Sequence, residues 1–266
     1  IAGKILFVEA EQGLGDTIQF CRFAKLAADR GAHVILMVQA SLAGLLQTLD
    51  PRIEIVSAPP SLFDYHILLL SLPLALGIEV GTIPAATPYL GADPARAAAM
   101  RARIGDRGFK IGLCWQGSYT SRTRSFPLRA LENVARFPGV RLISLQKGDG
   151  IEQRDALPNG MRVENLGDDF PRDFDDTAAA MEAMDLIISC DTSVAHLAGA
   201  LGRPTWVALR HAADWRWLID RDDSPWYPGM KLFRQPKRGD WTGLFQKIEE
   251  KLAAIVATKS VDGKFD

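Results

Sequence analysis

The stretch from Asp191 to Pro204 carries the residues best suited to chemistry in this chain. It reads D-T-S-V-A-H-L-A-G-A-L-G-R-P and lies between two apolar stretches typical of buried strands, Leu186–Cys190 and Thr205–Leu209. Asp, Thr and Ser favour helix starts, and Gly202 followed by Pro204 is typical of a helix end, so a strand, a helix and a strand are predicted. A helix that begins at the carboxyl end of a strand offers N–H groups and the positive end of its dipole to a phosphate.

Four side chains at this helix start are candidate ligand-binding residues, namely Asp191, Thr192, Ser193 and His196. Asp191 has an alternative interpretation, in which it only caps the helix. His196 follows one turn into the helix, on a face otherwise made of Ala, Leu and Gly. A single histidine in a helix is more often structural, but this position favours contact with a phosphate or a sugar.

A second group of polar residues follows the first predicted strand, in the turn G-L-G-D. Gly13 and Gly15 permit a tight turn with close approach of the backbone, at the edge of a cleft. Ile18 replaces the third glycine of a dinucleotide fingerprint, which disfavours a hydride-transferring Rossmann enzyme. Asp16 is expected either to cap a helix, with Gln19 completing a variant capping box, or to face the cleft as a carboxylate that accepts a hydroxyl proton.

Cations follow two further predicted strands. Arg124 lies in the polar loop 115–127, and the next strand ends in Gln146 and Lys147. Arginine binds diphosphate oxygens well because its guanidinium donors form a fork. Since the carboxyl ends of parallel strands meet at one edge of a sheet, we expect these residues to share a phosphate site with Asp191.

The whole chain alternates between predicted strands and helices. The strands are expected at 4–9, 34–38, 53–57, 66–70, 110–115, 140–146, 162–165, 186–190, 205–209 and 230–233. The helices are expected at 17–30, 41–49, 95–104, 128–136, 177–184, 191–202 and 241–258. This order predicts an α/β fold with parallel sheets and right-handed crossovers. The pattern restarts near residue 108, which predicts two Rossmann-like domains, 1–107 and 108–266, that face a cleft.

Composition narrows the class of protein. The chain has 266 residues, 47% of them hydrophobic and 24% charged, which is ordinary for globular domains. A net charge of −1 gives no overall field that would attract nucleic acid or an acidic membrane. Three well-separated cysteines have no metal-ligand spacing and indicate a reducing, cytoplasmic compartment. The longest apolar run, 67–76, is too short to span a bilayer.

Three motifs together resemble glycosyltransferase family 9, whose best-known members are the ADP-heptose:lipopolysaccharide heptosyltransferases. They are Gly13-Leu14-Gly15-Asp16, Arg124-Ser125-Phe126-Pro127 and Asp191-Thr192-Ser193 with His196-Leu197. Two later segments, 214–217 and 223–228, look closer to the family-9-like domain of bacterial tetratricopeptide-repeat proteins. The chain begins at Ile1, so we expect it to be a fragment or trimmed chain and its repeat region to lie outside this sequence.

The resemblance implies a GT-B architecture with the nucleotide-sugar donor in the C-terminal domain, and inversion at the anomeric carbon without a metal or other cofactor. It implies that Asp16 is the general base. Thr192 and Ser193 would offer backbone N–H groups to the donor phosphates, with His196 beside them. Arg124 stands where heptosyltransferases usually carry a lysine. We also expect the C-terminal helix to pack back across onto the first domain, through aromatic residues of 215–226. The alternative is that these aromatic residues line the donor pocket.

The resulting prediction is an inverting, metal-independent glycosyltransferase. Its donor would be a nucleoside-diphosphate sugar, and its acceptor a hydroxyl of a glycan, a lipid-linked glycan or a protein. Two alternatives remain at this point. One is a non-catalytic nucleotide- or sugar-binding module of a larger repeat protein. The other is a GT-B nucleotide-sugar epimerase, which would need no external acceptor.

Overall fold

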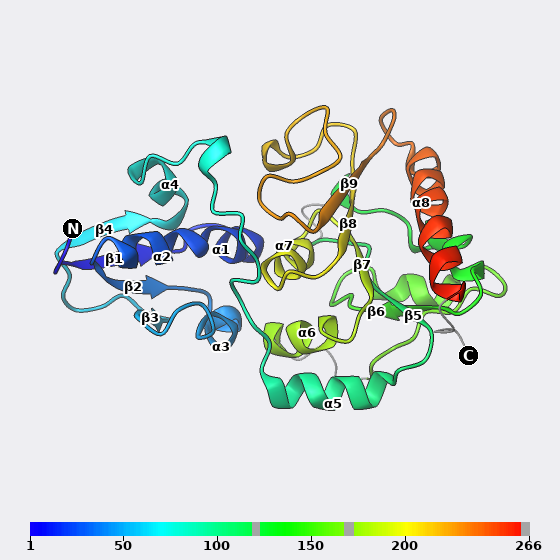
Figure 1. Ribbon diagram of the computed structural model, residues 1–266, viewed down its shortest axis with the longest axis horizontal. Coiled ribbons are helices and arrows are strands. Elements are labelled where there is room, and N and C mark those ends of the chain that lie inside the picture. Colours follow the sequence, from blue (N-terminus) through cyan, green and yellow to red (C-terminus); the bar gives the residue numbers. More distant parts are fainter. Residues whose placement is uncertain (119–122, 168–172, 262–266) are drawn as a thin grey trace.

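Two parallel sheets, one in each half of the chain, form the framework of the molecule (Figure 1). The computed structural model describes residues 1–118, 123–167 and 173–261. The first sheet has the order β3-β2-β1-β4, and its strands are β1 (Ile5–Glu9), β2 (His33–Met37), β3 (Ile53–Val56) and β4 (Tyr65–Leu68). The second has the order β6-β5-β7-β8-β9, and its strands are β5 (Phe109–Cys114), β6 (Val140–Ser144), β7 (Leu186–Cys190), β8 (Thr205–Leu209) and β9 (Met230–Arg234). The expected α/β fold with two parallel sheets is confirmed.

Helices cover both sheets. The α-helices are α1 (Leu14–Phe20), α2 (Arg22–Asp29), α3 (Ala43–Leu46), α4 (Leu72–Ala75), α5 (Pro94–Ile104), α6 (Phe174–Met181), α7 (Ser193–Ala200) and α8 (Trp241–Val261). The short 3₁₀ helices are η1 (Ala40–Leu42), η2 (Leu69–Ser71), η3 (Val80–Thr82), η5 (Leu128–Leu131), η6 (Val134–Arg136), η7 (Ile151–Ala156) and η8 (Trp215–Trp217). Among the described residues, no helix is both long enough and apolar enough to cross a membrane.

The second sheet is buried on both faces, as its continuous apolar strands predict. Neighbouring residues of β7 point to opposite sides: Ile187 belongs to the core shared with α6 and α7, and Ile188 to the core beneath α8. The register aligns apolar residues of neighbouring strands: Ile111 of β5 lies opposite Leu142 of β6 and Leu186 of β7. The carboxyl ends of these strands therefore form one edge, where their loops meet.

Several expected elements differ from those observed, besides shifts of a few residues at element ends. The helix expected at 41–49 is η1 followed by the short helix α3. The helix expected at 17–30 begins earlier, at Leu14, and is divided at Cys21 into α1 and α2. Near this division Ile18 O accepts side-chain hydrogen bonds from the Tyr89 hydroxyl (2.9 Å) and the Cys21 thiol (3.2 Å). The helix expected at 128–136 is the pair η5 and η6, whose apolar residues recur every third position, the period of a 3₁₀ helix. The strand expected at 162–165 is a single bridge between Glu164 and Ile143.

The prediction that the C-terminal helix packs back onto the first domain is wrong. Leu244, Phe245 and Ile248 of α8 pack on the second domain's own sheet, and α8 lies on the side away from the first domain (Figure 1). Only the contact from the aromatic segment was anticipated: Trp226 packs against Phe20, with ring centroids 5.6 Å apart. A short connection joins β9 to α8, so the apolar face of α8 packs on the sheet to which β9 belongs.

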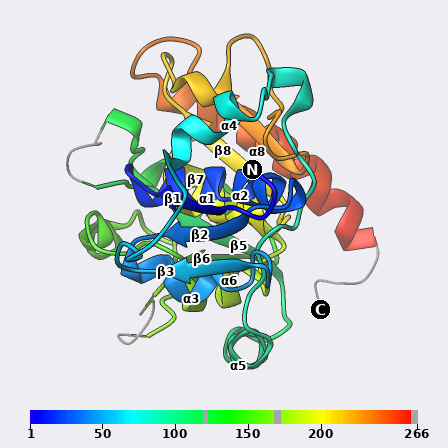
Figure 2. The ribbon, with the colours of Figure 1, turned by 90° about the vertical axis from the view of Figure 1, so that its left-hand side faces the viewer.

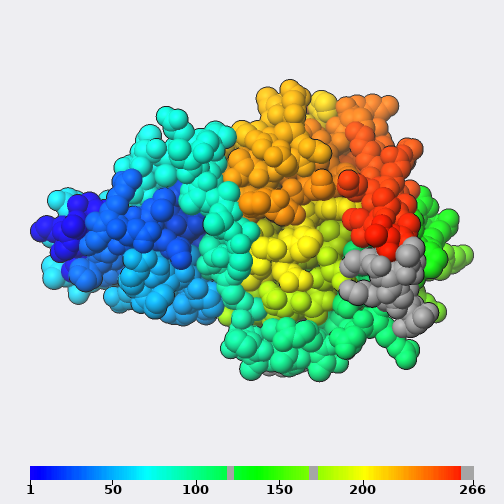
Figure 3. Space-filling model, in the orientation of Figure 1, coloured from blue at the N-terminus to red at the C-terminus, as the bar shows by residue number. Residues whose placement is uncertain are grey.

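The helix α5 links the two halves. It falls within the predicted range 1–107, yet it packs against α6 of the second half, at the lower edge of Figures 1 and 2. Arg96 of α5 forms ion pairs with Asp173 and Asp176, each at 3.0 Å. The chain leading to α5 covers the junction between the halves on the face seen in Figure 3.

The two domains share one continuous apolar core where α1 meets α7. The approach is close at Gly15, where an added Cβ would lie 3.0 Å from His196 Cδ2 and 3.3 Å from Ser193 Cα. Nothing larger than glycine fits here without movement, which explains the glycine at this position of the G-L-G-D turn. The first turns of α1 and α7 therefore lie next to each other.

Candidate functional site

A cavity of about 610 Å³ opens between the domains at the carboxyl edges of both sheets. Every residue proposed from the sequence as catalytic, donor-binding or cleft-lining borders it: Gly13, Gly15, Asp16, Arg124, Gln146, Lys147, Asp191, Thr192, Ser193 and His196. Its size is that of a pocket for a ligand of small-molecule dimensions. The structure therefore brings together residues from four separate segments, as the strand-end argument requires.

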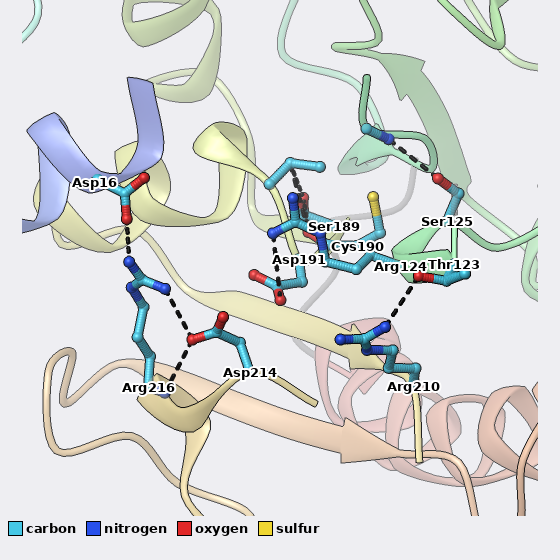
Figure 4. A network of polar contacts seen from close by, with 12 residues as sticks. Asp16, Thr123, Arg124, Ser125, Ser189, Cys190, Asp191, Arg210, Asp214 and Arg216 are labelled. Atoms are coloured by element: carbon cyan, nitrogen blue, oxygen red, sulfur yellow. Dashed lines mark hydrogen bonds and ion pairs between the residues drawn. The ribbon is translucent and has the colours of Figure 1, made fainter. Parts of the chain in front are cut away.

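Asp16 lies in the first turn of α1, and the expected position as helix cap is wrong. Gly13 is the N-cap, and Asp16 is the third helical residue, whose Oδ2 accepts the Gly13 N–H at 3.0 Å. Gln19 does not complete a capping box with it, because the helix begins three residues earlier than the motif suggested. The other carboxylate oxygen, Oδ1, accepts from the guanidinium of Arg216 (Figure 4).

Arg216 is the important residue that the sequence analysis missed. It lies in η8, in the segment that follows β8, and borders the cavity. Besides Asp16, its guanidinium donates to Gln19 Oε1 and to Asp214 Oδ1, both at 2.8 Å. Its position after the carboxyl end of a central strand was a usable signal, of the same kind that singled out Arg124.

The start of α7 forms the opposite wall. Thr192, with extended backbone, is the N-cap, so Asp191 lies just before the helix and does not cap it. The Thr192 hydroxyl lies 3.3 Å from Ser189 Oγ, inside the fold. Since the first N–H groups of any helix lack partners within it, the turn that begins at Ser193 presents donors to the cavity.

Asp191 and Arg124 form an ion pair beside this helix start, with Arg124 Nη1 3.8 Å from Asp191 Oδ2 (Figure 4). The Asp191 carboxyl is buried, and burial raises its pKa, although Arg124 acts in the opposite direction. Arg124 remains about one-third exposed (34% of its side chain) and can turn its donors toward a ligand.

Gln146 shapes the wall by holding two loops. Its Oε1 accepts the backbone N–H groups of Trp115 and Gln116, both at 3.0 Å, and its Nε2 donates to Gln116 O and Asp149 O. These contacts use both ends of the amide. Lys147, the next residue, also borders the cavity, so the held loop places a cation there.

His196 is buried beneath the cavity. Its ring stacks on Trp217, with centroids 5.3 Å apart, and its Nδ1 lies 3.0 Å from the Tyr227 hydroxyl. Burial, assisted by Arg216 and Arg22, lowers the pKa of His196 to about 3, so the imidazole is neutral near pH 7. It can offer a hydrogen bond or an aromatic edge to a ligand, but no charge.

The electrostatics of the cavity alternate in sign. Asp16 and Asp214 flank Arg216 on one side, and Asp191 pairs with Arg124 on the other (Figure 4). Within residues 1–118, 123–167 and 173–261, no group of three or more His, Cys, Asp or Glu side chains is placed to hold a metal ion.

Comparison with known proteins places this geometry in context. No protein-family model matches the chain. The protein FlbA of Caulobacter vibrioides is 29% identical over 286 residues, covering 97% of this chain and 48% of FlbA. The chain thus spans about half the length of this curated relative.

Several solved structures align with almost the whole chain, among them a heptosyltransferase and a family 9 glycosyltransferase. ADP-heptose lipopolysaccharide heptosyltransferase II of E. coli aligns with 97% of this chain and 99% of its own, at a TM-score of 0.69 and 15% identity. The chain has the fold of these transferases. A family 9 glycosyltransferase from Veillonella parvula gives a TM-score of 0.66 at 12% identity, covering 97% of this chain and 98% of its own. The expected GT-B-like architecture and the structural resemblance to family 9 are confirmed, and at these identities the likeness concerns the fold.

Proposed function

We propose that this chain transfers a sugar from a nucleoside-diphosphate donor to an acceptor hydroxyl, with inversion and without a metal. One observation carries the proposal. A carboxylate of the first domain, Asp16, faces the same cavity as the cation Arg124 and the start of α7 from the second domain. A proton acceptor on one side and a phosphate-binding edge on the other is the arrangement that a direct displacement needs.

The second domain would hold the donor. In this proposal, Arg124, Lys147 and the first N–H groups of α7 bind the diphosphate and stabilise the negative charge that grows as the sugar bond breaks. Preorganised donors of this kind are each worth about 3 kcal/mol of transition-state stabilisation. Their positive charge takes the role that a divalent cation has in metal-dependent transferases.

Asp16 would act on the acceptor. The acceptor oxygen attacks the anomeric carbon from the face opposite the diphosphate, and its proton passes to the Asp16 carboxylate. One C–O bond forms while the bond to the diphosphate oxygen breaks, which inverts the anomeric centre. A positioned base contributes typically about 10²–10⁴-fold to the rate. Glycans, lipid-linked glycans and protein hydroxyls are the acceptor classes that fit this chemistry.

The first experiment is a thermal-shift panel of nucleoside diphosphates and nucleotide sugars, with and without EDTA. A ligand at 100 times its Kd stabilises the folded state by about 2.7 kcal/mol, which gives a clear rise in melting temperature. We expect one nucleotide family to give a shift that EDTA leaves unchanged. Loss of that shift in EDTA would overturn metal independence.

The second experiment measures release of nucleoside diphosphate with a panel of acceptors. We expect Asp16→Asn to lower turnover by about 10²–10⁴-fold and leave donor affinity near that of the wild type. Asp106→Asn, an exposed acid that does not border this cavity, is the matched control. Full activity of Asp16→Asn would overturn its assignment as base. Donor binding without transfer would favour a binding module, and conversion of the donor without acceptor an epimerase.

A further inference from the structure

We propose that Arg216 is a positioning residue, which fixes the orientation of the Asp16 carboxylate from the opposite domain. This inference rests on the proposed function, because it assigns a role within the same reaction. Arg216 belongs to the second domain and Asp16 to the first, 200 residues earlier in the chain. The base would therefore be complete only where the two domains meet.

Each of the three guanidinium nitrogens of Arg216 donates a hydrogen bond. Its Nη2 donates to Asp16 Oδ1, its Nε to Gln19 Oε1 and its Nη1 to Asp214 Oδ1. The side chain is only 13% exposed although it borders the cavity. With these three acceptors engaged, Arg216 is built to hold Asp16 and is poorly placed to turn toward a phosphate.

The segment around Arg216 is itself fixed. Asp214 caps η8 by accepting the Arg216 N–H at 3.2 Å, and the Trp226 indole N–H donates to the Arg216 carbonyl at 3.0 Å. The Trp215 ring covers the guanidinium, whose central carbon lies 4.9 Å from the ring centroid. Packing and hydrogen bonds of this kind lock a side chain in one rotamer before any substrate arrives.

The consequence concerns Asp16. One of its oxygens accepts the Gly13 N–H, and the other accepts from Arg216, so the plane of the carboxylate is set by both domains. Each oxygen keeps a second lone pair for a substrate proton. A base whose rotamer is fixed in this way reacts faster than one that must be oriented in each turnover.

The test is a double-mutant cycle with wild type, Arg216→Ala, Asp16→Asn and the double variant. We expect Arg216→Ala to lower kcat about 10²-fold and to change donor Kd less than 3-fold. Because Arg216 acts through Asp16, the double variant should be no slower than Asp16→Asn alone. Multiplicative losses would overturn the positioning role. Arg221→Ala, in the same segment but paired with Asp223, is the control and should retain kcat within 2-fold.

Chemical rescue separates positioning from a merely structural role. Added guanidinium ion, at concentrations far below those that unfold the protein, should restore part of kcat in Arg216→Ala and none in Asp16→Asn. A variant that had only lost its packing would not recover, and absence of rescue together with a lowered donor affinity would overturn the inference. Arg216→Lys should retain more kcat than Arg216→Ala because it keeps a donor toward Asp16.

A second double-mutant cycle uses the same four proteins and measures the midpoint of urea unfolding. It does not depend on catalytic activity. Non-additive midpoints would show that Asp16 and Arg216 pair in solution. A wild-type protein that binds no nucleotide and transfers no sugar overturns the proposed function and the positioning role with it. Coupled midpoints with uncoupled losses of kcat overturn the positioning role alone.

Discussion

Two arginines cross the junction between the domains, in opposite directions and in different surroundings. Arg22 starts in α2 of the first domain and reaches Trp226 O of the second at 2.7 Å, whereas Arg216 starts in the second domain and reaches back to Asp16. Arg22 is only 3% exposed, and its guanidinium donates to three backbone carbonyls and to the Tyr89 hydroxyl. Arg216 borders the cavity between two carboxylates.

The difference shows that one residue type can cross the same junction with quite different partners, neutral groups for Arg22 and carboxylates for Arg216. The charge of Arg22 lies over the rings of Tyr89 and Tyr227, 4.2 Å and 4.7 Å from their centroids, and is sealed from water. Rings and carbonyl dipoles can stabilise a buried guanidinium without a carboxylate. The carboxylates Asp16 and Asp214 instead pair with Arg216, and Asp16 is the proton acceptor of the proposed reaction.

The largest expected effect on stability comes from removing the buried hydrogen bonds of Arg22 across the junction. Arg22→Met keeps an unbranched aliphatic stem but removes the guanidinium. The carbonyls of Gln19, Pro84 and Trp226 lose this donor, so we expect the free energy of unfolding to fall by about 3 kcal/mol. Urea unfolding measures it.

The control for this change is Arg136→Met, an exposed arginine paired with Glu132, which should cost less than about 1 kcal/mol. Equal losses for the two variants would mean that burial does not distinguish them, and the contrast between Arg22 and Arg216 would lose its basis.

A smaller effect is expected where α1 touches α7, at Gly15. The added methyl of Gly15→Ala would press on His196 Cδ2 and Ser193 Cα at 3.0 and 3.3 Å, so we expect a loss of about 1–2 kcal/mol in the free energy of unfolding. Gly81→Ala is the matched control, because an added Cβ there meets nothing within 4 Å. A stable Gly15→Ala would show that the junction can open without cost.

The sequence was informative where short-range rules apply. Apolar runs located the strands of both sheets. The rule that parallel strands end at one edge of a sheet predicted that Arg124 and Asp191 lie together, and both border one cavity with Asp16. Arg22 and Arg216 escaped notice because their partners lie about 200 residues away in the chain. Patterns within a segment cannot reveal such pairs, since they depend on how the finished domains meet.

The same limit applies to α8 and to the helix starts. The amphipathic pattern of 241–258 identified a helix but not the surface that it covers, because either domain offered an apolar face. The D-T-S and G-L-G-D motifs located the starts of α7 and α1, but the cap fell one residue later in the first and three residues earlier in the second. The position of a cap depends on which hydrogen bonds a side chain makes in the folded protein. Asp16, for example, accepts from both the Gly13 N–H and Arg216.

The smallest effect concerns His196, which lies near both arginines and beside Tyr227. Its pKa is about 3 in the folded protein and near 6.5 in the unfolded chain, because burial, Arg216, Arg22 and Arg124 disfavour the imidazolium. Between these values only the unfolded state takes up the proton, so the free energy of unfolding falls as pH decreases below 6.5. The contribution is about 1.4 kcal/mol at pH 5.5.

His196→Asn should therefore be less sensitive to acid than the wild type, although it loses stacking on Trp217 at every pH. Urea unfolding at pH 7.5 and 5.5 gives the difference for each protein, and we expect the variant's difference to be smaller by about 1 kcal/mol. His33→Asn, at an exposed position, should behave like the wild type. An unchanged pH dependence in His196→Asn would mean that the imidazole is hydrated and can be protonated in the folded state. The cavity floor would then be open to water, and the junction at Arg216 looser than the one at Arg22.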